Sequence, residues 1–572
     1  MCVKYLRFFI LPFILSALLL TGCSSKEKPP EFISVLKEKI PDLMEKARVP
    51  GLSIAVIRDG KIAWTGAFGV RSTESGEKVD ENTMFEAASL SKPVTAYTVL
   101  RLVEQGIMTL DTPLCEYYPY DFLAEDDRYK QLTARIVMTH TTGLPNWGSR
   151  FIRNPGEKFG YSGEGFLYLG RTAEKLTGLS LQELAKREVF DPLGMEHTSY
   201  VWNEAYDRNG ACGHGRDAKP NEKRKQTEPN GGASLLSTAR DYATFVAAIL
   251  NAKGLSKGTI AQMISPHVKA DDRGPKETHD KLFWGWGWGI MPSESENAFW
   301  HWGNNGDLRG YVVAYPERKE GIVFFANSEN LFVMAEAIIE EVIEEKQWPF
   351  DWMEVLRLDD PAWSVRTDIE DAFLKDNAEA GMKLFASVRE SQPELLNERA
   401  IFEMVGLISQ NGKKEEAAGL LRLMLEDSPK SLNARFFLGI ISFEMGDYAA
   451  GLKEMDTCLE ISPGFKRAQF GRDWILAAAE ARKNPVKVPM EMLEKYAGDY
   501  GPRHIYLHEG NLFYQRDGRD AYKLIPLKPD YFSLEGYTSF RIQFVSDENG
   551  NVKKIVGHYQ EGNTDQSPRD DK

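Results

Sequence analysis

Four short apolar runs near the two ends of the first 360 residues have the length and composition of β-strands. Asp59-Gly60 lies between the first two runs, and Asp-Gly between apolar runs is a strong signal for a two-residue β-hairpin. The region between the outer pairs of runs is rich in helix-forming segments and Gly/Pro turns. We therefore expect one mixed α+β domain over residues 32–360, with an antiparallel sheet and a helical region. The predicted strands are 52–57, 62–68, 310–314 and 321–326.

Between residues 365 and 485 the pattern changes to pairs of helices. Gly412 and Gly446 are 34 residues apart, as are Pro429 and Pro463 (446 − 412 = 463 − 429 = 34). This is the period of tetratricopeptide repeats, and the copy around Gly446 resembles their consensus. We expect an α-helical repeat segment that either binds a protein partner or braces the neighbouring domain.

The last part of the chain changes character again. Residues 490–562 alternate short apolar segments with Gly, Asp and Asn turns such as Asn549-Gly550. This pattern predicts a small all-β domain, either an antiparallel sheet or a barrel. We expect the polar residues 563–572 to form a disordered tail.

The first residues predict where in the cell the protein is located. Lys4 and Arg7 precede an apolar run, 8–20, that is shorter than the roughly 20 residues of a membrane span, so residues 1–22 have the pattern of a signal peptide. Residues 20–23 end in Cys23 and resemble the bacterial lipobox, which implies cleavage before Cys23 and lipid attachment to its sulfur. Plain secretion and an uncleaved anchor are the alternatives. A lipid on Cys23 and a tether over 23–31 would hold the protein in the bacterial cell envelope, on the extracytoplasmic side of a membrane.

Composition narrows the classes of partner. The 572 residues are 42% hydrophobic, which is enough for several ordinary domain cores. The net charge of −14 and the lack of a basic stripe argue against nucleic-acid binding. Cys115, Cys212 and Cys458 are too widely spaced for a metal or disulfide framework. We therefore expect no metal ion and no other cofactor.

Candidate chemistry is found at Ser89 and Lys92, just before Pro93, where a helix should start. Residues three apart share a helix face, so the Ser89 hydroxyl and the Lys92 amine can meet. Lys92 also continues an apolar stripe that includes Ala96 and Val99, which should turn its amine toward the core. Burial and the helix dipole both disfavour the ammonium form, so Lys92 could act as a base. A solvated helix start with no chemistry is the alternative, because Ser-x-x-Lys is common by chance.

Six segments in order resemble the serine β-lactamase and penicillin-binding-protein-like hydrolases, especially the class C β-lactamase and esterase branch. The resemblance covers residues ~32–350 and implies that family's fold. The segments are Ser89-Leu90-Ser91-Lys92, His140-Thr141-Thr142-Gly143-Leu144-Pro145, Tyr161-Ser162-Gly163, Phe190 to Met195, Gly231 to Asp241, and His301-Trp302-Gly303.

The resemblance also implies roles. Ser89 would attack an acyl carbonyl, Lys92 would accept or relay its proton, and Tyr161 would act as the partner acid or base. The amides of Ser89 and Asn304 would bind the oxyanion, with Gly303 allowing close approach. We interpret His140 as a brace of its loop, and His301 as either a substrate contact or a structural residue.

Two departures from the family pattern bear on the substrate. Gly163 stands where the family has an asparagine, and His301 stands where true β-lactamases have a lysine for the substrate carboxylate. A serine hydrolase that acts through an acyl-enzyme on an ester or a D-amino-acid-containing peptide fits these departures best. A β-lactamase or cell-wall D,D-peptidase is the second reading. A catalytically silent fold that binds a partner through its repeats is the third.

Overall fold

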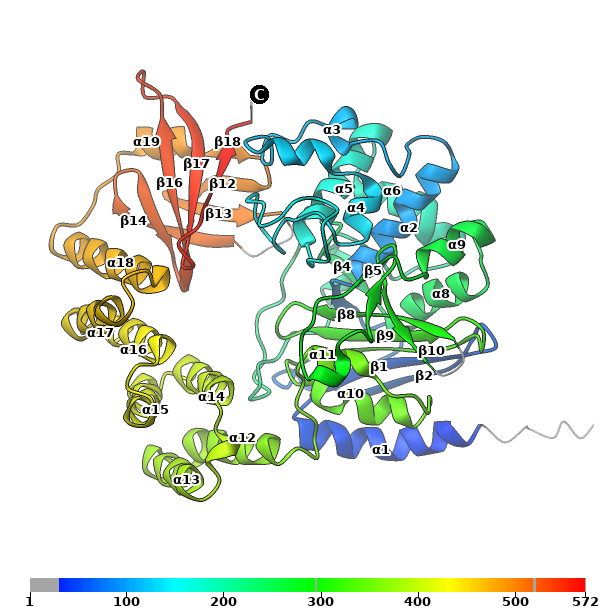
Figure 1. Ribbon diagram of the computed structural model, residues 1–572, viewed down its shortest axis with the longest axis horizontal. Helices are drawn as coiled ribbons and strands as arrows, with labels where there is room; N and C mark the ends of the chain where they lie inside the picture. Colours follow the sequence, from blue (N-terminus) through cyan, green and yellow to red (C-terminus); the bar gives the residue numbers. More distant parts are fainter. Residues whose placement is uncertain (1–29, 294–295, 518–520, 571–572) are drawn as a thin grey trace, which may run out of the picture.

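The computed structural model describes residues 30–570 except 294–295 and 518–520 (Figure 1). The predicted signal peptide and Cys23 lie outside the described residues. Among the residues that are described, no helix has both the length and the apolar character needed to cross a membrane.

The first domain is built on an eight-stranded antiparallel sheet in the order β2-β1-β10-β9-β8-β7-β6-β5. The predicted hairpin is present: Asp59 and Gly60 both have positive φ (51° and 69°), as its two-residue turn requires. The pairing of β1 with β10 brings the two ends of this domain together, as expected. The strands are β1 (Gly51–Arg58), β2 (Lys61–Gly69), β5 (Val268–Lys269), β6 (Phe283–Trp284), β7 (Gly289–Pro292), β8 (Asn297–Asn304), β9 (Arg309–Tyr315) and β10 (Glu320–Ala326).

Helices cover both faces of this sheet. The helices α1 (Glu31–Ala47) and α10 (Leu331–Glu340) pack on one face, and α2 (Ser91–Glu104) and α8 (Ala239–Leu250) pack on the other (Figure 1). A separate two-stranded sheet pairs β3 (Phe85–Ala88) with β4 (Leu235–Ser237). The remaining α-helices of the domain are α3 (Leu114–Tyr117), α4 (Ala134–Met138), α5 (Gly163–Thr177), α6 (Leu181–Ala185), α7 (Asp191–Leu193), α9 (Lys257–Met263) and α11 (Trp348–Trp352).

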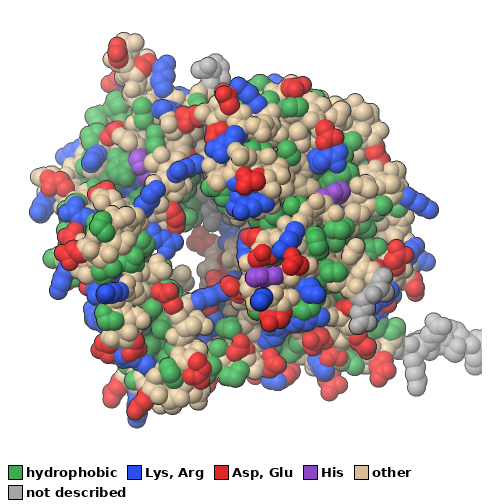
Figure 2. Space-filling model, in the orientation of Figure 1, with side chains coloured by type: hydrophobic (Ala, Val, Ile, Leu, Met, Phe, Trp, Pro, Cys, Tyr) green, Lys and Arg blue, Asp and Glu red, His purple; other side chains and the backbone are tan. Residues whose placement is uncertain are grey.

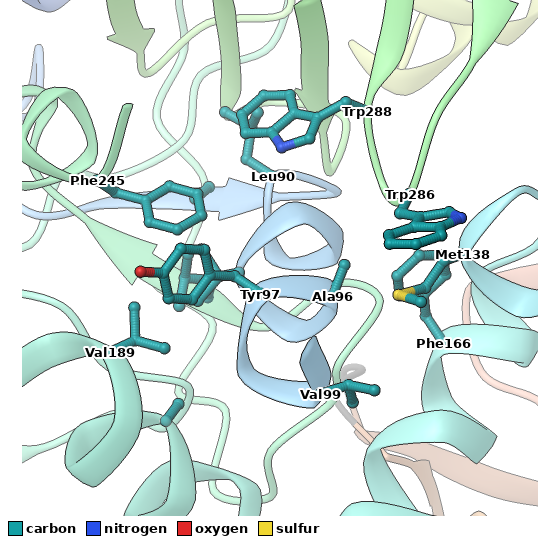
Figure 3. Packing of buried hydrophobic residues seen from close by; sticks show 14 of the residues in the cluster. Leu90, Ala96, Tyr97, Val99, Met138, Phe166, Val189, Phe245, Trp286 and Trp288 are labelled. Carbon is teal, nitrogen blue, oxygen red and sulfur yellow. The ribbon is translucent and has the colours of Figure 1, made fainter. Parts of the chain in front are cut away.

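Helix α2 is central rather than amphipathic. The single apolar stripe expected from the sequence is part of a helix that is buried on nearly all sides, including at Thr95 and Thr98. Figure 3 shows Tyr97 of this helix packed among apolar side chains from other elements, among them Phe245 and Trp288. The two threonines are accommodated because each hydroxyl donates to a backbone carbonyl, Gly231 O and Val94 O respectively. A central helix gives the residues at its N-terminus a rigid support.

The second part of the chain is a stack of helices. Starts of alternate helices recur 34 residues apart, at 398, 432 and 466 and again at 414 and 448. The helices are α12 (Pro361–Asp371), α13 (Ala378–Ser391), α14 (Glu398–Gln410), α15 (Lys414–Asp427), α16 (Leu432–Glu444), α17 (Tyr448–Ile461) and α18 (Lys466–Lys483).

The third part is an all-β domain that follows α19 (Met490–Tyr496). Its eight strands pair in chain order in one antiparallel sheet, and the Asp570 amide donates to Asp499 O (2.9 Å), so the two edges of the sheet approach closure. The strands are β11 (Gly498–Tyr500), β12 (Arg503–His508), β13 (Asn511–Arg516), β14 (Ala521–Lys528), β15 (Tyr531–Leu534), β16 (Tyr537–Ser546), β17 (Val552–Tyr559) and β18 (Thr564–Pro568).

The expectation of a disordered tail over residues 563–572 is wrong for the part that the structure describes. Residues 564–568 form β18, which pairs with β17. The polar sequence of β18 hides its role, because Asp565 points inward and forms a fully buried ion pair with Arg503 (2.6 Å). A strand held by backbone pairing and an internal ion pair has no apolar alternation to reveal it.

Ion pairs connect the first domain to both the helical segment and the β-domain. Arg216 of the first domain forms ion pairs with Glu370 and Glu403 of the helical segment, and Arg171 pairs with Asp517 of the β-domain (2.6 Å). Figure 2 shows an opening between the helical segment and the first domain. The chain therefore forms a ring in which the β-domain returns to the domain that holds Ser89.

Candidate active site

Ser89 lies on a tight turn between β3 and α2. The preceding residue, Ala88, has φ of +49°, a conformation that costs energy for a residue with a side chain, and the β3–β4 register shifts at this point. Ser89 is partly exposed, whereas its neighbours are buried. The turn thus lifts one hydroxyl out of a buried segment.

Lys92 is fully buried and faces this hydroxyl. Its Nζ lies 3.0 Å from Ser89 Oγ and donates to Gly232 O (2.7 Å). The same nitrogen lies 4.7 Å from the centre of the Tyr161 ring. The predicted meeting of Ser89 and Lys92 is present, and the solvated helix start is excluded for this lysine.

Tyr161 forms the wall opposite α2. Its ring stacks on His140 (centroids 4.3 Å apart) and packs against Trp302 (4.9 Å). Burial raises the pKa of the phenol well above its usual value, and the neighbouring Ser89 hydroxyl opposes this shift only in part. Within the described residues, its buried oxygen has no partner at full hydrogen-bond geometry. Tyr161 is therefore a neutral phenol next to the nucleophile at neutral pH.

His140 braces the loop that carries Tyr161, as we interpreted it. Its Nδ1 accepts a hydrogen bond from the Ser162 amide (3.0 Å). Burial, and secondarily the charge of Lys92, hold the His140 pKa well below its ordinary value. A neutral imidazole that accepts a backbone hydrogen bond orients its loop rather than moving protons.

Strand β8 supplies the third wall. Its first half, 297–300, pairs with β7, and within the described residues no strand pairs with 301–304 on that side. A Cβ on Gly303 would lie 2.2 Å from Ala87 O, so only glycine lets β8 approach β3 this closely. Asn304 at the end of the strand is exposed. The backbone of 303–304 therefore lies beside the Ser89 turn, where the predicted oxyanion site would be.

His301 is fully buried on β8, next to Tyr161 and Trp284. Its Nδ1 donates to Trp302 O (2.7 Å). Burial, with a smaller effect from Lys92, lowers the His301 pKa to about 3. The imidazole is neutral at physiological pH and offers no positive charge to a substrate carboxylate.

The structure explains why position 163 is a glycine, which the sequence alone did not reveal. A Cβ at this position would lie 2.7 Å from two ring atoms of Trp147 and 2.9 Å from Asn146 Oδ1. The Gly163 amide donates to that same oxygen (2.9 Å). Trp147 and the Asn146 side chain thus occupy the space that a side chain at position 163 would need, and Trp147 lies two residues after Pro145, where the His140–Pro145 motif ends.

Arg309 is another cationic side chain in this domain, but it does not supply the positive charge that neutral His301 lacks. Its guanidinium lies over the Phe332 ring (5.1 Å) on α10 and lines a groove of ≈ 810 Å³ between the first domain and α14. The charge of Arg309 therefore faces the helical segment rather than Ser89.

Comparison with known proteins places this site in a family. The β-lactamase family model matches residues 36–343, which include the Ser89, Tyr161 and His301 segments. The chain belongs to the β-lactamase family, whose members are serine hydrolases.

Individual relatives are distant. The chain is 20% identical to Protein flp of Staphylococcus aureus (strain MRSA252) over 332 residues, covering 53% of this chain and 65% of that protein, which is less than two thirds of its length. It is 24% identical to a β-lactamase of Yersinia enterocolitica over 354 residues, covering 51% of this chain and 86% of that protein. Among solved structures, D-alanine carboxypeptidase AmpC from Burkholderia cenocepacia is similar at TM-score 0.47 with 22% identity, covering 54% of this chain and 99% of that one. A class C β-lactamase is similar at TM-score 0.49 with 19% identity, covering 56% and 99%.

Proposed function

We propose that the protein is a serine hydrolase that forms an acyl-enzyme at Ser89 and cleaves an ester or a D-amino-acid-containing peptide. The observation that carries the proposal is the 3.0 Å contact between Ser89 Oγ and the buried Lys92 Nζ. A serine hydroxyl needs an adjacent base to become a nucleophile, and here the base is held in place by the Gly232 carbonyl.

The proposed reaction begins when Lys92 has given up the proton of its ammonium form, because only the neutral amine has a lone pair. One N–H of the amine donates to Gly232 O, which leaves its lone pair to take the Ser89 proton as Oγ attacks the substrate carbonyl. The amides of Ser89 and Asn304 stabilise the resulting oxyanion. The tetrahedral intermediate collapses as the leaving group takes the proton held by Lys92, either directly or by relay, in which the Tyr161 phenol gives its proton to the leaving group and takes one from Lys92. Water then attacks the acyl-enzyme with the same groups acting in reverse.

The substrate preference follows from His301 and Gly163. Neutral His301 cannot form the ion pair that a lysine would form with a carboxylate. The space for a side-chain amide after Tyr161-Ser162 is filled by Trp147. Both features favour an uncharged acyl group over a β-lactam.

A substrate panel tests this proposal. We expect the purified full chain to hydrolyse a short-chain ester, with a chromogenic cephalosporin and a D-Ala-D-Ala peptide turned over more slowly. Ser89→Ala should abolish every activity. Rapid cephalosporin hydrolysis would favour the β-lactamase reading, and ester turnover that survives Ser89→Ala would overturn the proposal.

We further propose that the helical segment is a short tetratricopeptide-like stack that braces the ring. The 34-residue recurrence of helix starts and the ion pairs of Arg216 with Glu370 and Glu403 support this role. Charge-reversing substitutions on the exposed helix surfaces should leave ester turnover unchanged. Recovery of a specific protein partner that depends on those surfaces would favour the interaction reading instead.

We also propose that the chain is a lipoprotein of the bacterial cell envelope, anchored through Cys23. The lipobox-like sequence supports this location. Metabolic labelling with a fatty-acid analogue should mark the wild-type chain and not Cys23→Ala, which should leave the membrane fraction. Equal membrane retention of both chains would contradict lipid anchoring.

A further inference from the structure

The β-domain contacts the active-site region through Asp517, the residue that follows β13. The carboxylate of Asp517 pairs with Arg171 of α5 (2.6 Å) and with His504 Nε2 (2.7 Å). Its backbone carbonyl accepts a hydrogen bond from Asn230 Nδ2 (3.0 Å). Asp517 is 2% exposed and Asn230 is 0% exposed, so these contacts are shielded from water.

Asn230 connects this contact to the proposed base. Its Oδ1 accepts from the Gly232 amide (2.8 Å), and Gly232 O accepts from Lys92 Nζ (2.7 Å). One side-chain amide therefore bonds the β-domain with its nitrogen and the loop that holds Lys92 with its oxygen. Buried hydrogen bonds linked in this way strengthen one another and fix the orientation of each group.

A second contact holds the opposite wall of the site. Arg516 forms a buried ion pair with Glu164, the residue after Gly163, and the same Glu164 oxygen accepts from the Gly148 amide (2.9 Å). The Arg516 guanidinium also lies 5.8 Å from the centre of the Trp147 ring. The β-domain thus touches both the Lys92 side and the Tyr161 side of the site.

We propose that Asn230 is a positioning residue for acylation, held by Asp517, and that the β-domain is therefore part of the catalytic unit. This inference rests on the proposed function. By binding the Gly232 amide, Asn230 fixes the backbone at Gly232 and so holds the carbonyl of the same residue, which directs one Lys92 N–H away from Ser89 and leaves the amine's lone pair facing the hydroxyl. Loss of Asn230 frees the backbone at Gly232 to change its dihedral angles, which should slow acylation without weakening substrate binding.

The test uses the full chain and a fluorophosphonate, which labels activated serines. The rate constant for labelling Ser89 is measured between pH 5 and 10 in wild type and Asn230→Ala, with thermal unfolding to verify folding. We expect Asn230→Ala to lower the rate constant at least tenfold, with kcat for the ester falling and KM nearly unchanged. Asn411→Ala is the matched control, because Asn411 also bonds across domains, to Asp217 (3.0 Å), at the helical segment. It should stay within twofold of wild type.

Asn230→Asp tests the positioning role of Asn230 if Asn230→Ala does not fold. The carboxylate keeps an acceptor for the Gly232 amide but cannot donate to Asp517 O. It also favours the ammonium form of Lys92, so the ascending limb of the pH profile should move to higher pH. The titratable groups that face Lys92 are Tyr161, His140 and His301, and burial keeps both imidazoles neutral over this range.

The outcomes separate the two proposals. Wild-type protein that is not labelled at Ser89 overturns the proposed function itself. Labelled wild type, together with a folded Asn230→Ala or Asn230→Asp variant that has an unchanged rate constant and pH profile, overturns only the positioning role of Asn230.

Discussion

Lys92 is the residue on which the chemistry depends. A buried amine that bonds both Ser89 Oγ and Gly232 O has no exposed surface and a fixed direction. The sequence predicted the pairing because three-residue spacing at a helix start is local geometry. It could not predict the Gly232 carbonyl, which lies 140 positions away in the chain, or the positive φ of Ala88.

Removing the amine should remove general-base catalysis. We expect Lys92→Ala to lower kcat for the ester by roughly 10²–10⁴-fold, the range typical of a positioned base. Steady-state kinetics of the purified full chain measure this effect. A Lys92→Ala variant with kcat within threefold of wild type would show that another group takes the Ser89 proton.

Gly163 should not tolerate the family's asparagine. Gly163→Asn drives a side chain into Trp147, and overpacking of this kind costs about 1–3 kcal/mol of unfolding free energy. Denaturant unfolding should detect the loss, and ester turnover should fall because the Tyr161 loop shifts. Gly406→Asn, where a Cβ meets nothing within 4 Å, is the matched control on another helix. A Gly163→Asn variant that is as stable as this control and gains cephalosporin turnover would contradict our account.

At the scale of elements, the sequence predicted what local signals determine. Asp59-Gly60 specified the β1–β2 hairpin through its turn, and the 34-residue spacing specified where helices recur. Strand β18 was missed because its inward-facing Asp565 pairs with Arg503, a contact that only the folded sheet creates. Trp147 was missed for the same reason, since its contact with Gly163 is tertiary.

The contact of His504, on β12, with Asp517 should make the domain interface sensitive to pH. Hydrogen bonds with Asp517, and then Asp499, raise the His504 pKa to about 9, against the opposing effect of burial. Because the folded-state pKa is raised, this contribution to stability is complete below about pH 6.5, the unfolded value, and is lost as pH rises through about 9.

Thermal unfolding of wild type and His504→Gln between pH 6 and 10 measures this effect. We expect the difference between the two unfolding temperatures to shrink as pH rises from 6.5 to above 9. The His504 side chain is 29% exposed, so the change should be modest and smaller at high salt. A difference that stays constant over this range would show that His504 does not carry the proton at the interface.

At the scale of the whole molecule, the three domains form a ring that is closed by buried charges. Arg516 and Glu164 are 8% and 0% exposed, so replacing either one leaves the charge of the other uncompensated in the interior. The sequence indicated three consecutive domains but gave no sign that the last returns to the first. The partners are more than 350 residues apart, and neither lies in a recognisable motif.

Removing the β-domain should therefore weaken the domain that holds Ser89. We expect a chain ending at residue 484 to unfold at a lower denaturant concentration, because Glu164 loses its Arg516 partner and the surface that faces the β-domain becomes exposed. Denaturant unfolding and ester turnover measure this. A shortened chain with full stability and activity would show that the β-domain is an independent module.

The central claim is that Ser89 is an activated nucleophile, and covalent trapping tests it most directly. The full chain is treated with a fluorophosphonate, and the modified residue is located by peptide mass spectrometry. We predict a single adduct on Ser89 that is absent from Ser89→Ala and unchanged in Ser75→Ala, an exposed serine of the same domain. No adduct on wild type, or an adduct that persists in Ser89→Ala, would contradict the account.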